Sequence, residues 1–236
     1  MNRKKLLCIA MCVMMCLAVF TACGSGSDKS GSGTASSAAS ESSDSSAGSD
    51  QSAAPTAADN SLKEFSQDEL LTGKHHVKMD IKDHGTVTLE LDADQAPITV
   101  TNFIDLAKKG FYNGLTFHRI IPGQFVQGGD PNGDGTGSAG YNIKGEFKAN
   151  GVNNTLSHTR GAISLARTVD NNGGCCQFFI MDADYTDFDG QYACFGYVTD
   201  GMDVIDDICK NAKVQDQNGT VAKADQPVIS SVTVVD

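Results

Sequence analysis

The strongest constraint on the fold is a period-two alternation of apolar and polar residues that begins near residue 77. Residues 77–81 and 87–91 both alternate in this way, and Asp83-His84-Gly85 lies between them. Because successive side chains of a strand point to opposite faces, each run has one apolar and one polar face. Two such runs joined by a short turn sequence predict a β-hairpin.

Further segments of strand length follow, and two segments have the pattern of helices. Two strands are expected within 117–130, and single strands at 162–166, 177–181, 194–198 and 228–235. The first helix begins at Pro97, has Lys108 and Lys109 in its last turn and stops at Gly110. The second helix is expected at residues 202–209.

These elements amount to about eight strands and two helices in one domain, residues 74–236. A lead-in segment with a short helix or turn, residues 61–73, precedes it. Because closing a sheet on itself leaves no unpaired strand edges, we expect a mainly β fold: a closed eight-stranded antiparallel β-barrel, capped at its mouths by two α-helices.

The first 60 residues are not expected to belong to this domain. Residues 1–22 have a basic start and an apolar run too short for an ordinary membrane span, as in a secretory signal peptide. Small residues then precede Cys23, as in a bacterial lipobox, where the cysteine is lipidated. Residues 23–60 are rich in Ser, Gly and Ala and cannot bury a core, so a disordered tether is expected. The alternatives are a plain signal peptide with an incidental cysteine, and a tail without a spacer role.

Charge and cysteine content exclude other classes of protein. The formal net charge is −11, and removal of residues 1–22, with three basic and no acidic residues, makes it −14. No basic stripe is present, which argues against nucleic acid as a partner. Four cysteines lie beyond the lipobox, at 175, 176, 194 and 209, and none forms a CxxC motif. Free, packed thiols are expected; a redox switch at Cys175 and Cys176 is the alternative.

The segment "FHRIIPGQFVQGGDP", residues 117–131, places Arg119 and Gln127 among apolar residues. If residues 122–124 form a three-residue turn, Arg119 lies opposite Gln127, and opposed residues share a face. A two-residue turn would instead place Arg119 opposite Val126. The spacing alone also permits an ordinary solvated arginine on the outer face of a barrel.

The segment "FHRIIPGQFVQGGD" resembles the signature of the cyclophilin-type peptidyl-prolyl isomerases. Upstream, "HGTVTLELDADQAPITVTNFIDLAKKGFYNGLTFHR" resembles the opening hairpin and first helix of that family. The later segments "GAISLAR", "QFFI" and "FDGQYACFGYVTDGMDVID" resemble further family segments in the same order. The resemblance covers the whole domain and implies a cyclophilin-like fold.

The resemblance also implies roles for individual residues. Arg119 is similar to the catalytic arginine, Gln127 to the residue that orients it, and His118 to a further site residue. Phe125, Phe179 and Phe188 match the apolar pocket for the proline ring. The other implied substrate-binding residues are Gln124, Ala166, Arg167, Thr168, Gln177 and Tyr192. Two residues depart from the family pattern: Gln124 replaces an aromatic pocket residue, and Asp187 replaces Trp or His, which predicts weak binding of cyclosporin.

The implied chemistry requires no metal, cofactor or nucleophile. Rotation about a peptide bond must break amide resonance, with a barrier of about 18–20 kcal/mol. A fixed guanidinium that donates a hydrogen bond to the nitrogen of the twisted amide stabilises the transition state more than the planar ground state. Arginine suits this role better than lysine because its planar fork can be held by Gln127 while it also donates to the substrate.

Other polar clusters favour ordinary structural roles. Residues 130–135 resemble half of a calcium loop, but Tyr141 replaces the final glutamate, so a glycine-rich surface loop is expected. The acidic residues of 182–189 show no ligand pattern. His75-His76 are expected to be simply exposed, with weak chelation of a metal as the alternative. His158 is expected to be structural, and no serine lies in a nucleophile motif.

The sequence therefore predicts a monomeric peptidyl-prolyl cis-trans isomerase, lipid-anchored through Cys23 at the extracytoplasmic face of the cell membrane. Its expected partners are proline-containing unfolded or exported polypeptides, whose uncatalysed isomerisation takes tens of seconds. The alternative is a weakly catalytic or non-catalytic module that binds proline peptides as a chaperone or adhesion factor. A redox protein using Cys175 and Cys176 is a third hypothesis.

Overall fold

The computed structural model describes residues 61–236. The predicted signal peptide, the predicted lipidation site Cys23 and the predicted tether to residue 60 lie outside the described residues. Within residues 61–236, no helix combines the length and the apolar composition needed to span a bilayer.

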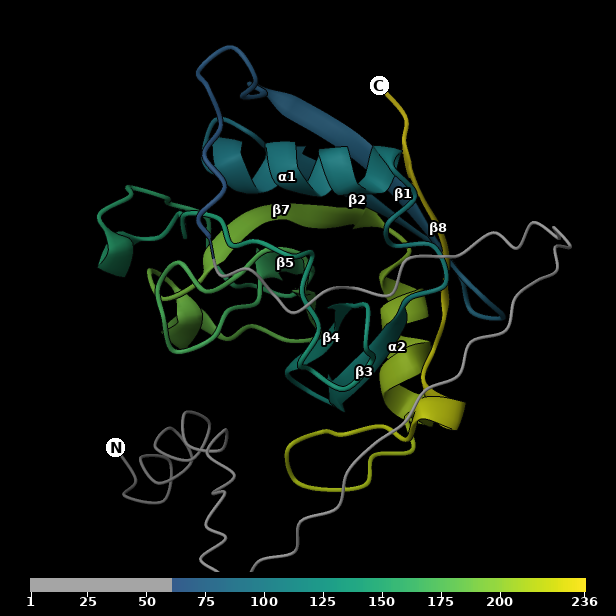
Figure 1. Cartoon of the computed structure of the whole chain (residues 1–236). Coiled ribbons are helices and arrows are strands. Elements are labelled where there is room, and N and C mark those ends of the chain that lie inside the picture. Colours follow the sequence, from purple (N-terminus) through teal and green to yellow (C-terminus); the bar gives the residue numbers. More distant parts are fainter. Residues whose placement is uncertain (1–60) are drawn as a thin grey trace, which may run out of the picture. The chain divides into compact units, whose positions relative to one another are not determined.

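Eight antiparallel strands form one curled sheet, in the order β3-β4-β6-β5-β7-β2-β1-β8 (Figure 1). The mainly β composition, the antiparallel pairing and the two helices are as predicted. The strands are β1 (Lys74–Ile81), β2 (Gly85–Asp92), β3 (Thr116–Ile121), β4 (Phe125–Asp130), β5 (Ala162–Leu165), β6 (Phe178–Met181), β7 (Ala193–Asp200) and β8 (Ile229–Val234).

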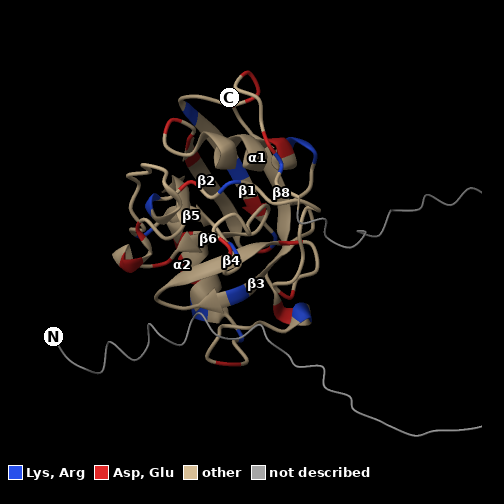
Figure 2. Ribbon diagram, turned by 60° about the vertical axis from the view of Figure 1, so that its left-hand side comes forward, with Lys and Arg blue, Asp and Glu red and all other residues tan. Residues whose placement is uncertain are grey.

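The predicted hairpin is formed by β1 and β2. Met79 lies opposite Val87, and both side chains are fully buried, because the apolar positions of the two strands share the inner face. The turn requires left-handed backbone at Asp83, with φ of 64°, and at Gly85, with φ of 131°. Acidic and basic residues, red and blue in Figure 2, lie mainly in loops and near the ends of elements around this sheet.

The prediction of a closed barrel is wrong, because the sheet is an open, curled half-barrel. The edge strands β3 and β8 meet only at their ends, where Thr116 forms an isolated bridge with Val228. Further along β3, its free edge pairs with a loop instead, since Ile120 N–H donates to Gly219 O (2.8 Å) and Val221 N–H donates to His118 O (3.1 Å). The loop satisfies the edge groups that closure would otherwise have paired.

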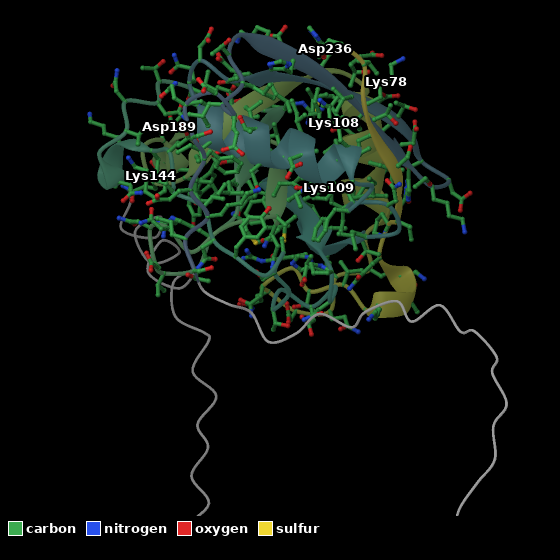
Figure 3. All side chains as sticks on the ribbon, turned by 45° about the horizontal axis from the view of Figure 1, so that its top comes forward. Lys78, Lys108, Lys109, Lys144, Asp189 and Asp236 are labelled. Carbon is green, nitrogen blue, oxygen red and sulfur yellow. The ribbon has the colours of Figure 1, made fainter. Side chains whose placement is uncertain are left out.

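Two α-helices cover the sheet, α1 (Pro97–Lys108) and α2 (Met202–Asn211). Helix α1 begins with Pro97, and the buried carboxylate of Glu146 accepts hydrogen bonds from the N–H groups of Ile98 (2.9 Å) and Thr99 (2.7 Å). Such an anion suits the unpaired N–H groups and positive dipole of a helix start. At the other end of α1, Lys108 and Lys109 are adjacent on the surface (Figure 3).

Three short 3₁₀ helices lie in the loops, at Lys148–Asn150, Thr186–Phe188 and Lys223–Asp225. The lead-in segment contains a turn but no helix, so of the two expected forms only the turn is present. Lys63 N–H donates to Asn142 O (2.8 Å), and Leu71 packs against the main core. The lead-in therefore lies against the domain.

The main core lies between α1 and the inner face of the sheet, and Phe178 of β6 is at its centre. This side chain is fully buried and contacts Phe103, Tyr112 and Phe117 edge to face, at centroid distances of 5.7, 5.7 and 6.0 Å. Edge-to-face contacts are favourable beyond the area that they bury. β6 carries Phe178 on this face and Phe179 on the other. The core therefore also fixes the strand that carries the predicted pocket residue Phe179.

We expect Phe178→Ala to lower the free energy of unfolding by about 3–5 kcal/mol, because it leaves a cavity among three aromatic rings. Urea denaturation followed by circular dichroism measures this loss. Val169→Ala is the control, since Val169 is 83 % exposed, and should change stability by less than about 0.5 kcal/mol. Equal stability of both variants would contradict the central role of Phe178.

Candidate active site

Strands β3 and β4 bring the predicted catalytic residues together. Residues 122–124 form a three-residue turn, with Ile121 opposite Phe125 and Arg119 opposite Gln127. This is the register predicted from the longer turn. The solvated arginine that the spacing also permitted is not what the structure contains, because Arg119 is only partly exposed and its side chain is held on several sides.

The guanidinium of Arg119 is fixed by two hydrogen bonds and one ring contact. Nε donates to the carbonyl of Asn218 (2.7 Å) and Nη1 donates to Oε1 of Gln127 (3.2 Å). The central carbon lies 5.0 Å from the centroid of the Phe125 ring, a distance suited to a cation–π contact. Nη2 donates to no group of residues 61–236, so it can donate to a bound molecule.

Gln127 is itself oriented by Gln177. Nε2 of Gln127 donates to Oε1 of Gln177 (3.0 Å), and Nε2 of Gln177 donates to the carbonyls of Gly135 (3.1 Å) and Gly137 (3.0 Å). The chain of amides leaves Oε1 of Gln127 facing the guanidinium. Three sequence-predicted residues, Arg119, Gln127 and Gln177, therefore form one network.

Four predicted aromatic residues belong to a second hydrophobic cluster, and we call these four the aromatic cluster: Phe125, Phe179, Phe188 and Tyr192. Phe125 and Phe179 are buried and lie 5.4 Å apart between ring centroids, and Phe188 lies 6.3 Å from Phe125 and 5.1 Å from Tyr192. Because Arg119 lies over the Phe125 ring, a cation borders an apolar surface.

His158 supports this cluster. The sequence predicted a structural role for His158 but not its contact with the cluster. It is fully buried, and its ring stacks on Phe179 with a centroid distance of 6.0 Å. Its Nδ1 lies 2.8 Å from Oδ1 of Asp189 and its Nε2 lies 3.0 Å from Oγ of Ser164. Ser164 is also fully buried, so His158 and Ser164 support the cluster from the protein interior and are inaccessible to a substrate.

The remaining predicted residues lie around the network and the cluster. Ala166 N–H donates to Gln177 O (2.9 Å), and Thr168, two residues further along the chain, is exposed. The guanidinium of Arg167 lies 4.9 Å from the Tyr192 ring centroid. Gln124 is half-buried in the turn before Phe125, and its carbonyl accepts the N–H of Asp182 (2.8 Å). The departing residue Asp187 is exposed.

His118 is placed differently from Arg119 although the two are adjacent. The register of β3 and β4 shifts between Phe117 and Arg119, which leaves His118 at a bulge. It is 5 % exposed, and burial lowers the pKa of its ring. Its side chain forms no hydrogen bond with Arg119, Gln127 or Gln177, so its site role stays a prediction.

The other polar clusters have local partners. The carboxylate of Asp130 accepts the N–H groups of Asn132 and Asp134, which fixes the glycine-rich loop. His75 and His76 pair with carboxylates of Asp236 and Glu90. Residues 61–236 contain no group of three or more His, Cys, Asp or Glu placed to hold a metal ion.

The cysteines within residues 61–236 are free and buried, at positions 175, 176, 194 and 209. The sulfur atoms of Cys175 and Cys176 lie 3.5 Å apart. Thiols packed in this way agree with the structural reading of these residues.

A fixed guanidinium at the edge of an aromatic surface can donate a hydrogen bond to a molecule that packs an apolar ring on that surface. The family model for "Cyclophilin type peptidyl-prolyl cis-trans isomerase/CLD" matches residues 76–234. The chain belongs to this family. Family membership supports isomerisation of Xaa-Pro peptide bonds as its activity.

Several relatives carry the name peptidyl-prolyl cis-trans isomerase. A protein of Helicobacter pylori (strain ATCC 700392 / 26695) is 45% identical over 126 residues, which cover 52% of this chain and 74% of the relative. Isomerase B of Bacillus subtilis (strain 168) is 44% identical over 123 residues, covering 52% and 82%. Isomerase B of Escherichia coli (strain K12) is 38% identical over 159 residues, covering 64% and 94%.

Solved structures agree with the fold. The crystal structure of a Cryptosporidium parvum cyclophilin-type isomerase superposes with a TM-score of 0.61 at 26% identity, and covers 70% of this chain and 99% of that chain. A second crystal structure of that protein, in the presence of the dipeptide ala-pro, gives a TM-score of 0.60 at 26% identity and covers 68% and 99%.

We expect the stability that His158 contributes to decrease as the pH is lowered. Burial lowers the pKa of His158 below its usual 6.5, although Asp189 partly opposes this. The unfolded chain therefore binds a proton more readily, and acid favours unfolding between pH 6.5 and the folded pKa, by at most about 1.4 kcal/mol per pH unit.

Urea denaturation of wild type and His158→Gln between pH 7.5 and 5 tests this expectation. Wild type should be the more stable at pH 7.5, and the gap should narrow towards pH 5, because the variant has no imidazole to protonate. A gap that is constant or widens would show that His158 is not buried in its neutral form.

Proposed function

We propose that this chain accelerates the cis–trans rotation of Xaa-Pro bonds in exported polypeptides and so assists their folding outside the membrane. One observation carries the assignment of the site: the guanidinium of Arg119 is held by Asn218 and Gln127 against the ring of Phe125. Family membership supports the reaction, and this geometry supports the residues that perform it.

The aromatic cluster binds the proline ring in this proposal. Phe125 and Phe179 offer apolar ring faces, with Phe188 and Tyr192 beside them. A ring held there is fixed while the carbonyl of the preceding residue swings round. The Cryptosporidium relative solved with ala-pro is consistent with a proline-containing ligand for this family.

Arg119 then lowers the barrier to rotation. In the planar amide the nitrogen lone pair is delocalised, so the nitrogen is a poor acceptor. As the bond twists, the lone pair returns to the nitrogen, and Nη2 of Arg119 donates a hydrogen bond to it. Because Nε and Nη1 are already held by Asn218 and Gln127, little reorganisation is needed when the charge develops. No bond is made or broken, so the residues need only bind, orient and donate.

We expect Arg119→Ala to lower kcat/KM by about 10²-fold, the cost of removing one fixed transition-state donor. Binding of a proline peptide should change little, because the donor acts on the twisted amide. The measurements are proline-limited refolding of a protein substrate, and titration with the same peptide. Arg119→Lys should have an intermediate rate, since it keeps the charge but not the fork.

Arg160→Ala is the matched control, because Arg160 is held by Asp206 and Asp182 and is not part of the network. It should retain the wild-type rate. If Arg119→Ala accelerates refolding as well as wild type, Arg119 is not catalytic. If wild type accelerates nothing but binds proline peptides, the chain is a binding module.

We also propose that the domain is exported and anchored by lipid on Cys23 at the extracytoplasmic face. The support is in the sequence: a basic and apolar start, small residues before Cys23, and a tether in residues 23–60 that cannot bury a core. A flexible coil of this length spans roughly 30–36 Å, enough to separate the domain from a membrane surface.

A monomeric state is proposed as well. The large apolar side chains that are exposed within residues 61–236 are separated in sequence and few, namely Leu62, Val169, Val214 and Val235. Scattered residues of this kind do not require a partner.

We expect Cys23→Ser to release the protein from the membrane fraction in a bacterium that processes lipoproteins. Without the thiol no lipid is attached, and one or two acyl chains supply the binding energy of such an anchor. Fractionation followed by mass spectrometry of the N-terminus measures both effects, with Cys209→Ser as the control. Wild type that starts at residue 23 without added lipid mass would contradict the anchor.

A further inference from the structure

A cavity of about 410 Å³ lies beside the network of Arg119, Gln127 and Gln177. Three segments line it: the β3–β4 pair with His118, Arg119 and Gln127, the loop 132–135, and residues from the loop 215–226. No member of the aromatic cluster lines it, so it is a separate space. Because Arg119 and Gln127 belong both to its wall and to the network, a polypeptide bound at the site can extend into it.

His118 in the wall of this cavity lacks hydrogen-bond partners. The side chain is 5 % exposed, yet neither Nδ1 nor Nε2 has a partner, and these are the only two such buried side-chain nitrogen or oxygen atoms in residues 61–236. A buried polar atom without a partner destabilises the fold, because it has lost its hydrogen bonds to water without gaining others. The bulge of β3 places His118 here beside Arg119 rather than on the opposite face of the strand.

Two glycines keep the cavity open. A Cβ on Gly135 would lie 3.8 Å from Nε2 of His118, and a Cβ on Gly133 would lie 3.2 Å from Oε1 of Gln226. Both glycines have positive φ, 91° and 66°, which other residues adopt with strain. The backbone of this loop thus approaches His118 without filling the space around it.

The imidazole of His118 offers one donor and one acceptor. Burial lowers its pKa and Arg119 acts in the same direction, whereas Asp130 and Asp134 act against them. A neutral imidazole has one N–H and one bare nitrogen. A carboxamide has both a carbonyl acceptor and N–H donors, so it can pair with whichever of the two ring nitrogens faces the cavity.

We propose that this cavity binds the carboxamide side chain of an asparagine or glutamine that lies within two residues of the proline in the client polypeptide. The inference rests on the proposed function, because it assumes that the proline occupies the aromatic cluster. An extended chain advances about 3.3 Å per residue, so the neighbours of a proline held beside Arg119 reach the cavity. The volume also accommodates the adjoining backbone.

Other side chains match the cavity less well. The wall carries Asp134 as well as Arg119 and Lys223, so a carboxylate or an ammonium group would each meet a charge of its own sign there as well as the opposite one. A carboxylate also lacks the N–H donor that a bare imidazole nitrogen needs. An apolar side chain would leave both imidazole nitrogens unpaired. A site built to hydrogen-bond a polar group rejects an analogue that lacks it, because its own buried atoms then lose their partner.

The test uses the full chain and single-proline peptides in which each of the two positions on either side of proline is Gln, Glu, Lys or Leu in turn. Dissociation constants come from NMR titration, and isomerisation rates come from exchange spectroscopy on the same samples. At one position, Gln should bind at least about tenfold more tightly than Glu, its isostere, and than Leu. The ring nitrogens of His118 should shift in ¹⁵N spectra with the Gln peptide and not with the Leu peptide.

His118→Phe, which keeps a ring without polar atoms, should reduce the Gln preference to less than twofold, while Arg160→Ala, at a residue that does not line the cavity, should preserve it. The proposal fails if wild type prefers Gln at none of the four positions, or if the preference persists in folded His118→Phe. If His118→Phe does not fold, the ¹⁵N shifts of the wild type decide. Failure of the proposed function is distinct: peptides would bind with the expected preference but exchange no faster than without enzyme.

Discussion

The site depends on the register between β3 and β4. In a strand pair, a slip of one residue moves every side chain to the opposite face, so Arg119 meets Gln127 in one register only. Two glycines of β4 hold that register by close approach: a Cβ on Gly128 would lie 2.8 Å from Thr116 O, and one on Gly129 would lie 2.7 Å from Cys176 O. Neighbouring strands can pack this closely only where β4 has no side chain, so backbone contacts fix the position of the guanidinium.

Period-two patterning was sufficient to predict the hairpin and the strand count, because both follow from local geometry. The pairing of Arg119 with Gln127 was predicted only for a three-residue turn, and the structure contains that turn rather than the two-residue alternative. Closure of the barrel was not predictable in this way. The edge of β3 pairs with residues 219–221, and no local pattern distinguishes a loop that covers an edge from a strand that extends the sheet. The carbonyl of Asn218 that holds Arg119 carries no sequence signal either, since every residue has a carbonyl.

His158 shows a different limit of sequence reasoning. A lone histidine before a strand is compatible with many structural roles, and its contact with Phe179 arises only when residues distant in sequence meet. Its partners Asp189 and Ser164 satisfy both ring nitrogens, whereas both nitrogens of His118 remain unpaired. Two buried histidines therefore differ in what they contribute. One completes the support of the aromatic cluster, and the other leaves hydrogen-bonding capacity in the wall of a cavity.

The replacement of an aromatic residue by Gln124 does not remove the apolar surface beside Arg119, because Phe125 supplies it from the first residue of β4. Phe125 is 5 % exposed and contacts both Phe179 and Phe188, and it also lies under the guanidinium. A ring on a strand paired on both sides is held more firmly than a ring in a turn, since the backbone hydrogen bonds of β3 and β6 fix its position. The same side chain thus contributes to the proline-binding surface and to the orientation of the cation, so a change at Phe125 would alter substrate binding and rotation together.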